Sequence, residues 1–361
     1  MSEDKSPREI LAQLAMLGAA LGTVRYVAPI LLNGGVGGLG NPIIATGFTA
    51  LTGLPFAGLA VVGSFIPYTL FLTRRIPKQV GVPRIKPHSW KVPIGKTYWG
   101  KWVYFDFGGV IPHSITAGAT KFGKTAFLKM VLYVLCHQQP PEWLQILIID
   151  LKGGASFYAW RHVPHVLDVK RTVDEAEEVM EAAETEMWRR LDEIREAQLA
   201  FREVPKFPHL FVVVDEGSLL KLSDKAMKHL QNIAAIGREP HVHLLYGTQR
   251  PSHEILPVTI RDNMEGRFVF NLNEPGSSKV VLGEHDTSAY RFTNRPGRMF
   301  HQDSGYKVEL QASYVDDETI RAWLMDCARL VDVEGEVMDE ACPSSVSPHS
   351  ESIPDSLRFL G

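Results

Sequence analysis

The sequence has little cysteine and no strong excess of charge. Its three cysteines, Cys136, Cys327 and Cys342, have a spacing that matches neither a disulfide framework nor a metal site, and so few thiols fit a reducing compartment. The formal net charge of −3 excludes a protein that is basic throughout. Any contact with nucleic acid must therefore come from a local basic patch. We also find no cluster of metal ligands and no Ser-His-Asp spacing in the sequence.

Charged residues and histidine are missing altogether from residues 43–72. A membrane-spanning helix needs about 20 apolar residues, so this stretch is long enough to span a bilayer. Residues 10–32 are also apolar except for Gln13 and Arg25, and a glycine-rich turn over residues 33–42 separates the two stretches. We therefore expect a membrane anchor over residues 1–80 with two spans, about 10–32 and 45–72. Because Arg25 is costly inside a bilayer, a single span is an alternative. A buried soluble helix is the alternative for residues 43–72.

Acidic residues are absent between Thr73 and Phe105. The basic residues of this stretch are Arg74, Arg75, Lys78, Arg84, Lys86, Lys91, Lys96 and Lys101. The positive-inside rule places such a flank in the cytoplasm, so we expect a multi-pass protein of the cell membrane with a cytoplasmic main domain. The same residues could also contact anionic lipid or nucleic-acid phosphates.

Residues 113–125, HSITAGATKFGKT, match the phosphate-binding loop pattern G-x-x-x-x-G-K-[ST]. An apolar strand precedes the loop and an apolar helix follows it, which disfavours an ordinary glycine-rich turn. We expect Lys124 to reach the β- and γ-phosphates of ATP and the Thr125 hydroxyl to bind Mg²⁺. The backbone N–H groups and the helix N-terminus would surround the phosphates. The loop consists of Gly118, Ala119, Thr120, Lys121, Phe122, Gly123, Lys124 and Thr125.

Acidic and amide side chains follow further apolar strands. Residues 210–214 form a continuous apolar run that ends in Asp215 and Glu216. We expect Asp215 to act at Mg²⁺ and Glu216 to polarise the attacking water, as in a Walker B strand. Asp150 also closes an apolar strand, but it has no neighbouring carboxylate to act as base. Gln249 follows the strand over residues 242–246, where it could sense the γ-phosphate, hold the water or satisfy loop carbonyls.

The alternation of apolar strands and helices after residue 113 predicts an α/β fold with a mainly parallel sheet. A helix is expected over residues 174–201, with Met180, Ala183, Met187, Leu191 and Ile194 on its buried face. We expect residues 81–100 to be a basic linker, residues 101–330 to be the main domain, and residues 331–361 to be a disordered acidic tail rich in serine and proline.

Several segments occur in an order that resembles the FtsK/SpoIIIE family of membrane-anchored DNA translocases. The resemblance covers about residues 95–325 and implies a RecA-like P-loop core that forms a homo-hexamer around double-stranded DNA and moves it with ATP. It assigns the phosphate loop, Asp215, Glu216 and Gln249 to the family's site. It also implies an arginine supplied to the neighbouring subunit, for which Arg267 is the first candidate and Arg238 the second. The segments are residues 95–125, 148-IIDLKGG-154, 211-FVVVDEGSLL-220, 237-GREPHVHLLYGTQRPS-252 and 297-GRMF-300.

The chain departs from the family pattern in two respects. Lys121 and Phe122 replace the small residues that are usual in the loop. We also expect no winged-helix domain after residue 330 and no extra domain between anchor and motor. This layout is more similar to the FtsK-type coupling ATPases of Gram-positive conjugative elements, whose partners are a relaxase and channel proteins. The alternatives are a translocase for chromosome or plasmid partition, a protein-export ATPase, and a membrane anchor that binds nucleotide without hydrolysis.

Overall fold

The computed structural model describes residues 79–292 and 295–332. The two expected membrane spans lie outside these residues, as does the acidic tail except for residues 331 and 332, which are helical, so both stay predictions. Across the part of the chain that is described, none of the helices has the length and apolar content that crossing a bilayer requires.

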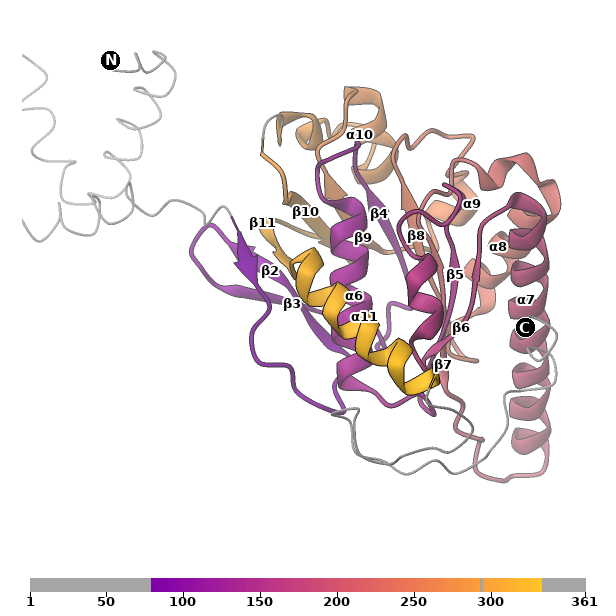
Figure 1. Ribbon diagram of the computed structural model, residues 1–361. Helices are drawn as coiled ribbons and strands as arrows, with labels where there is room; N and C mark the ends of the chain where they lie inside the picture. Colours follow the sequence, from indigo (N-terminus) through magenta and orange to yellow (C-terminus); the bar gives the residue numbers. More distant parts are fainter. Residues whose placement is uncertain (1–78, 293–294, 333–361) are drawn as a thin grey trace, which may run out of the picture. The chain divides into compact units, whose positions relative to one another are not determined.

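An eleven-stranded sheet forms the centre of the domain (Figure 1). The strand order is β3-β2-β11-β10-β9-β4-β8-β7-β5-β6, and β1 pairs with β11. The strands are β1 (Val80–Gly81), β2 (Lys91–Thr97), β3 (Trp102–Asp106), β4 (His113–Ala117), β5 (Leu144–Ile149), β6 (Val166–Lys170), β7 (His209–Val214), β8 (Val242–Thr248), β9 (Gly266–Phe270), β10 (Arg298–Asp303) and β11 (Tyr306–Tyr314).

The part of the sheet from β9 to β6 is parallel throughout, which confirms the predicted α/β fold. Strands β4, β7 and β8 are buried along their whole length, because helices cover both faces of the sheet. All three run in the same direction, so their carboxyl ends lie together at one edge of the sheet. The remaining part, from β9 through β10, β11 and β2 to β3, is antiparallel.

Helices pack on both faces of the sheet (Figure 1). On one face, α6 (Lys124–Gln138) and α11 (Asp317–Asp332) enclose a core that includes Ile146 and Ile148 of β5. On the other face, α7 (Val173–Leu199) and α8 (Asp224–Ile236) enclose a core that includes Leu147 and Ile149. The five residues predicted for the buried face of α7 are all buried. Two shorter helices, α9 (Val258–Arg261) and α10 (Pro275–Leu282), complete the second face.

Within residues 81–100, for which a linker was expected, Gly81 and Lys91–Thr97 belong to strands of the sheet. Strand β2 pairs with both β3 and β11, and its Val92 and Ile94 are fully buried in the core beneath α6. Their alternation with neighbouring residues is broken by Pro93 and Gly95, where the pairing with β3 shifts its register. Because proline and glycine are unfavourable in strand interiors, the sequence pattern suggested a linker.

A chain of buried histidines lies at the amino ends of the parallel strands. His209 Nδ1 is 2.8 Å from His243 Nε2, and His113 Nδ1 accepts a hydrogen bond of 3.0 Å from the backbone N–H of Leu244. Burial lowers the pKa of His113 and of His209 to about 3. These histidines are therefore neutral at ordinary pH.

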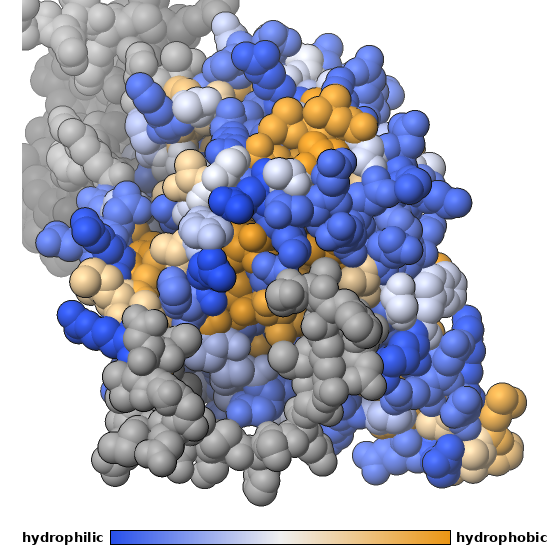
Figure 2. All heavy atoms as spheres, turned by 45° about the vertical axis from the view of Figure 1, so that its right-hand side comes forward, coloured by the Kyte–Doolittle hydropathy of each residue, from blue (hydrophilic) through white to orange (hydrophobic). Residues whose placement is uncertain are grey.

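Figure 2 shows a face on which hydrophilic side chains predominate and hydrophobic side chains gather in limited areas. Among the described residues, the large hydrophobic side chains with the highest exposure include Phe201 (98%), Leu199 (81%) and Leu222 (70%). The first two lie at the carboxyl end of α7, and Leu222 precedes α8. Exposed apolar side chains of this kind are common on folded proteins, so they identify no binding site here.

Candidate nucleotide-binding site

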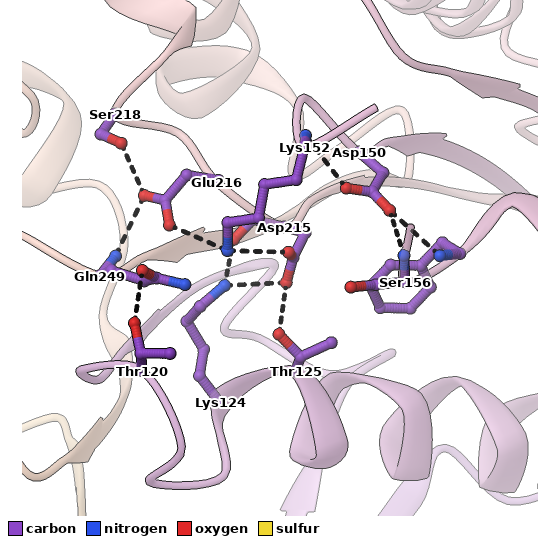
Figure 3. Close-up of polar contacts among 11 residues, drawn as sticks. Thr120, Lys124, Thr125, Asp150, Lys152, Ser156, Asp215, Glu216, Ser218 and Gln249 are labelled. Atoms are coloured by element: carbon purple, nitrogen blue, oxygen red, sulfur yellow. Dashed lines mark hydrogen bonds and ion pairs between the residues drawn. The ribbon is translucent and has the colours of Figure 1, made fainter. Parts of the chain in front are cut away.

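The predicted phosphate loop connects β4 to α6 at the carboxyl edge of the sheet (Figure 3). Two backbone hydrogen bonds hold its start between β8 and β9, from Gly118 N to Thr248 O (3.1 Å) and from Ala119 N to Asn271 O (2.8 Å). Gly123, at the N-cap of α6, has a φ of 110°, which favours glycine. Within the described residues, no side chain caps α6 and its first turn holds no acidic residue, so its N–H groups suit a phosphate.

Lys124 and Thr125 both contact Asp215. The sequence predicted that these three residues share one site, but it did not predict the contacts between them. Lys124 Nζ lies 2.8 Å from Asp215 Oδ1, and the Thr125 hydroxyl donates to the same oxygen at 2.9 Å. Lys124 and Asp215 are 3% and 0% exposed. Burial lowers the pKa of Lys124, and the charge of Asp215 opposes that shift. Burial alone would raise the pKa of Asp215, but the ammonium group of Lys124 holds it below its ordinary value.

Glu216 is a buried carboxylate that several partners hold in place. Its Oε1 accepts hydrogen bonds from the Ser218 hydroxyl (2.7 Å) and from the backbone N–H of Gln249 (3.1 Å). Its Oε2 forms an ion pair with Lys152 Nζ at 3.3 Å. Because the side chain is only 4% exposed, these contacts define its orientation at the end of β7. A fixed carboxylate next to a phosphate loop is suited to hold and deprotonate a water molecule.

Gln249 joins the phosphate loop to Glu216. In addition to the backbone contact with Glu216, its side-chain Oε1 accepts a hydrogen bond of 3.0 Å from the Thr120 hydroxyl. The structure thus brings Gln249 into the same constellation as Lys124 and Asp215, at the end of a central strand (Figure 3). A residue that bonds to both elements can respond when either of them moves.

The carboxylate of Asp150, the rival acidic residue, contacts only its own loop among the hydrogen bonds of the described residues. Its Oδ2 accepts from the backbone N–H of Ser156 (2.8 Å) and Phe157 (3.1 Å), and its Oδ1 accepts from Lys152 N (3.2 Å). The side chain is fully buried. Asp150 therefore shapes the loop after β5, and the geometry favours Asp215 as the acidic residue at the nucleotide.

Lys152 belongs to the site although sequence reasoning assigned it no role. Its Nζ lies 3.4 Å from Asp215 Oδ2 and 3.3 Å from Glu216 Oε2, so one ammonium group contacts both acidic residues (Figure 3). The available signal was a lysine directly after an apolar strand, within 148-IIDLKGG-154. Spacing alone could not reveal the contact, because it depends on how the loop after β5 folds.

The two unusual loop residues occupy different environments. Phe122 is half-buried and packs against the core beneath α6, and its carbonyl accepts a hydrogen bond from Gly297 N (3.0 Å). Lys121 is exposed and has a φ of 72°, in the left-handed region. The large side chains therefore fit without displacing the loop, but Lys121 adopts a strained backbone conformation.

The two candidate arginines both lie apart from these residues. Arg267 Nη1 donates to the carbonyl of Val281 at 2.8 Å, and burial lowers the pKa of this arginine. Arg238 is exposed and lines a cavity of about 350 Å³, together with His209 and His241, at the amino edge of the sheet. Separation from the site of the same subunit is expected of an arginine that acts on a neighbouring one.

The residues present fit Mg²⁺ together with a nucleoside triphosphate. The hydroxyl of Thr125 and the carboxylate of Asp215 are oxygen donors of the kind that Mg²⁺ takes. They are 2.9 Å apart, beside the uncapped start of α6. Asp215 also contacts the ammonium groups of Lys124 and Lys152, so its carboxylate already attracts positive charge.

Comparison with known proteins shows a similarity to one family of ATPases. Residues 83–205 match the model of the FtsK/SpoIIIE family. The chain is 29% identical over 255 residues to the ESX-4 secretion system protein EccC4 of Mycobacterium tuberculosis, covering 64% of this chain and 20% of that protein. It is 28% identical over 230 residues to the DNA translocase FtsK of Helicobacter pylori, covering 58% of this chain and 26% of that protein. The chain thus spans between a fifth and about a quarter of these two curated relatives.

A solved structure shares the fold over most of the described domain. The monomer form of the pCW3 conjugation coupling protein TcpA, determined with ATPγS, has a TM-score of 0.60 and 23% sequence identity. The match covers 70% of this chain and 75% of that one. Residues 83–205, which include the phosphate loop, are thus similar to the FtsK/SpoIIIE family, and the fold is shared with TcpA.

Proposed function

We propose that this protein is a membrane-anchored ATPase that moves double-stranded DNA and acts as the coupling ATPase of conjugative transfer. One observation carries the proposal: Lys124, Asp215, Glu216 and Gln249 lie together at the carboxyl edge of the sheet, in an arrangement suited to ATP hydrolysis. Residues 83–205, which include Lys124, match the model of the FtsK/SpoIIIE family, and the curated relatives include DNA translocases. A nucleotide-binding anchor without hydrolysis would not need Glu216 held in this orientation.

The chemistry follows from the positions of the side chains. Lys124 would leave Asp215 to bind the β- and γ-phosphates, while Thr125 and Asp215 would hold Mg²⁺, which neutralises phosphate charge. Glu216 would accept a proton from the attacking water, and Gln249 would report the change to the phosphate loop through Thr120. In the proposed homo-hexamer, changes at each site would move DNA held by its phosphates, without reading its sequence.

The exposed Arg238 is the better candidate for the arginine donated to a neighbouring subunit. Arg267 already uses its guanidinium to bind backbone carbonyls, whereas no ion pair of Arg238 is found among the described residues. Replacing Arg238 with alanine should therefore abolish hydrolysis while nucleotide binding persists. If Arg267→Ala abolished hydrolysis and Arg238→Ala did not, Arg267 would be the better candidate.

The proposal is tested by measuring ATPase activity of the full chain with and without duplex DNA. DNA should stimulate hydrolysis, and stimulation should weaken as salt rises, because contacts to phosphates release counterions. Glu216→Gln should lower the stimulated rate about 10²- to 10⁴-fold, the range for removing a general base, and Lys124→Ala should abolish it. Lys225→Ala, on the exposed surface of α8, is the matched control and should leave the rate unchanged. ATPase that survives both site substitutions would exclude the assigned residues.

Protein export is a second candidate, since the chain is similar to the secretion protein EccC4. The ATPase measurement with and without duplex DNA distinguishes protein export from DNA translocation. An ATPase that is indifferent to DNA at low salt, in a protein that binds a secreted polypeptide, would favour export. DNA-stimulated activity would favour translocation of nucleic acid.

The role in conjugation has its own test, because TcpA at 23% identity shows a shared fold only. Deleting the gene should reduce conjugative transfer and leave chromosome and plasmid partition intact, and a relaxase should co-purify with the protein. A partition defect with normal transfer would favour the cell-division type of translocase.

We also propose two membrane spans, about residues 10–32 and 45–72, ahead of a cytoplasmic motor. The uncharged stretch and the basic flank support this topology. With two spans, a reporter fused to the N-terminus should be cytoplasmic. An external N-terminus would mean a single span.

A further inference from the structure

Lys152 places a positive charge against the residue that the proposed site uses to hold Mg²⁺. Its Nζ is 3.4 Å from Asp215 Oδ2, while Lys124 and Thr125 share Asp215 Oδ1. Both carboxylate oxygens of this fully buried residue are thus in contact with donors from the chain itself. A divalent cation that binds Asp215 through Oδ2 must displace this ammonium group.

The loop after β5 is built to present this lysine. Gly153 and Gly154 have φ values of 74° and 79°, which other residues rarely adopt, and they turn the chain directly after Lys152. Asp150 fixes the same loop by accepting hydrogen bonds from the backbone of Lys152, Ser156 and Phe157. The position of the ammonium group therefore follows from the loop backbone as well as from the attraction of the two carboxylates.

The side chain is nevertheless able to leave. Lys152 is 33% exposed, in contrast to Lys124 at 3%, so its ammonium group can move into water at modest cost. Its second contact, with Glu216 Oε2 at 3.3 Å, lets Lys152 keep one partner when a cation binds Asp215. An exposed lysine that contacts a buried carboxylate is suited to act as an exchangeable cation.

We propose that Lys152 competes with Mg²⁺ for Asp215 and thereby sets the Mg²⁺ concentration that nucleotide binding requires. Lys152 then acts through Asp215, as a positioning residue. The inference rests on the proposed ATP site and adds to it a determinant of metal affinity. Removing the positive charge lowers the cost of placing a second cation beside Asp215, so the variant binds Mg²⁺ with nucleotide more tightly.

The test is Mg²⁺-dependent binding of fluorescent ADP to the full chain, which involves no turnover. Fluorescence is titrated with Mg²⁺ at constant ADP for the wild type, Lys152→Ala, Lys152→Gln and Lys152→Arg. The Mg²⁺ concentration at half-saturation should fall on the order of tenfold in the alanine and glutamine variants, equivalent to about 1.4 kcal/mol. It should stay near the wild-type value in Lys152→Arg, because arginine keeps the charge. Lys225→Ala removes a lysine paired with Glu177 outside the site and should change nothing.

Each outcome separates this inference from the proposed function. The proposed role of Lys152 is overturned if the Mg²⁺ concentration at half-saturation is unchanged or higher in Lys152→Ala and Lys152→Gln, and both variants unfold thermally like the wild type. The proposed ATP site would not be affected by that result. Equal tightening in Lys152→Arg also overturns it, since the effect would then not depend on charge. A wild type that binds no ADP at any Mg²⁺ concentration overturns the nucleotide site itself.

Discussion

At the scale of single residues, Lys121 combines an exposed side chain with a backbone conformation that suits glycine. Its φ of 72° costs about 1–2 kcal/mol for a residue with a Cβ. Glycine loses more chain entropy on folding, which offsets roughly half of that cost. We therefore expect Lys121→Gly to raise the free energy of unfolding by about 0.5–1 kcal/mol in urea titrations.

Lys121→Ala is the matched control, because alanine removes the charge and keeps the strain. Its stability should stay within about 0.5 kcal/mol of the wild type. If the alanine variant were the more stable of the two, the strain at Lys121 would not govern stability.

How much of the site can be read from the sequence differs from residue to residue. Lys124, Asp215 and Gln249 could be predicted together, because each follows an apolar strand and parallel strands end at one edge of the sheet. Lys152 could not, since its contact with Asp215 and Glu216 depends on the two glycine turns that follow it. The sequence already favoured Asp215 over Asp150, which has no adjacent carboxylate, and the contacts of Asp215 with Lys124 and Thr125 now support that order.

At the scale of elements, α7 begins with a complete capping box. The Thr172 hydroxyl accepts from Glu175 N at 3.3 Å, and Glu175 Oε2 accepts from Thr172 N at 2.9 Å. Hydrogen bonds from the backbone N–H groups of Arg171 and Thr172 hold the pKa of Glu175 below its ordinary value. Thr172→Ala should therefore lower the free energy of unfolding by about 1 kcal/mol, measured by chemical denaturation.

A threonine inside the same helix provides the comparison. The Thr185 hydroxyl donates to the carbonyl of Glu181 within the helix, where alanine is the better helix former. Thr185→Ala should be neutral or slightly stabilising. If Thr172→Ala and Thr185→Ala lowered the free energy of unfolding equally, the N-terminal cap would contribute no stability of its own.

The elements differ in how clearly the sequence predicts them. The parallel strands and α7 could be predicted, because continuous apolar runs and a 3-4 stripe are strong signals. Strand β2 was hidden by Pro93 and Gly95, and α11 was not foreseen, although its amphipathic face packs on the core beneath α6. The antiparallel pairings of β2 with β11 and of β9 with β10 join segments that are distant in sequence, which local patterns do not reveal.

At the scale of the whole molecule, buried neutral histidines make the domain sensitive to acid. Burial lowers the pKa of His113 and His209 to about 3 and that of His165 to about 4. In the unfolded chain histidine titrates near pH 6.5, so below that pH the unfolded chain binds more protons than the folded one. Stability should therefore be complete above pH 6.5 and fall as the pH decreases toward 4, by up to roughly 1.4 kcal/mol per pH unit for each histidine.

Urea midpoints at pH 7, 6 and 5 measure this loss. A His113→Gln variant should show a shallower pH dependence than the wild type, because one buried titratable group is gone. Identical midpoints at pH 7 and pH 5 would contradict the assignment of these histidines as buried and neutral in the folded protein.

Strand β1 is the part of the sheet on which a pulling force at the start of the domain would act. The strand has two residues, and its pairing with β11 joins Val80 to Ser313 and Gly81 to Tyr314. Any tension that the chain before residue 79 transmits enters the sheet here, and two pairs resist it far less than the continuous ladder between β10 and β11. Under load β1 would detach first and lengthen the segment that precedes β2, while the strands that carry the phosphate loop, Asp215 and Gln249 keep their register.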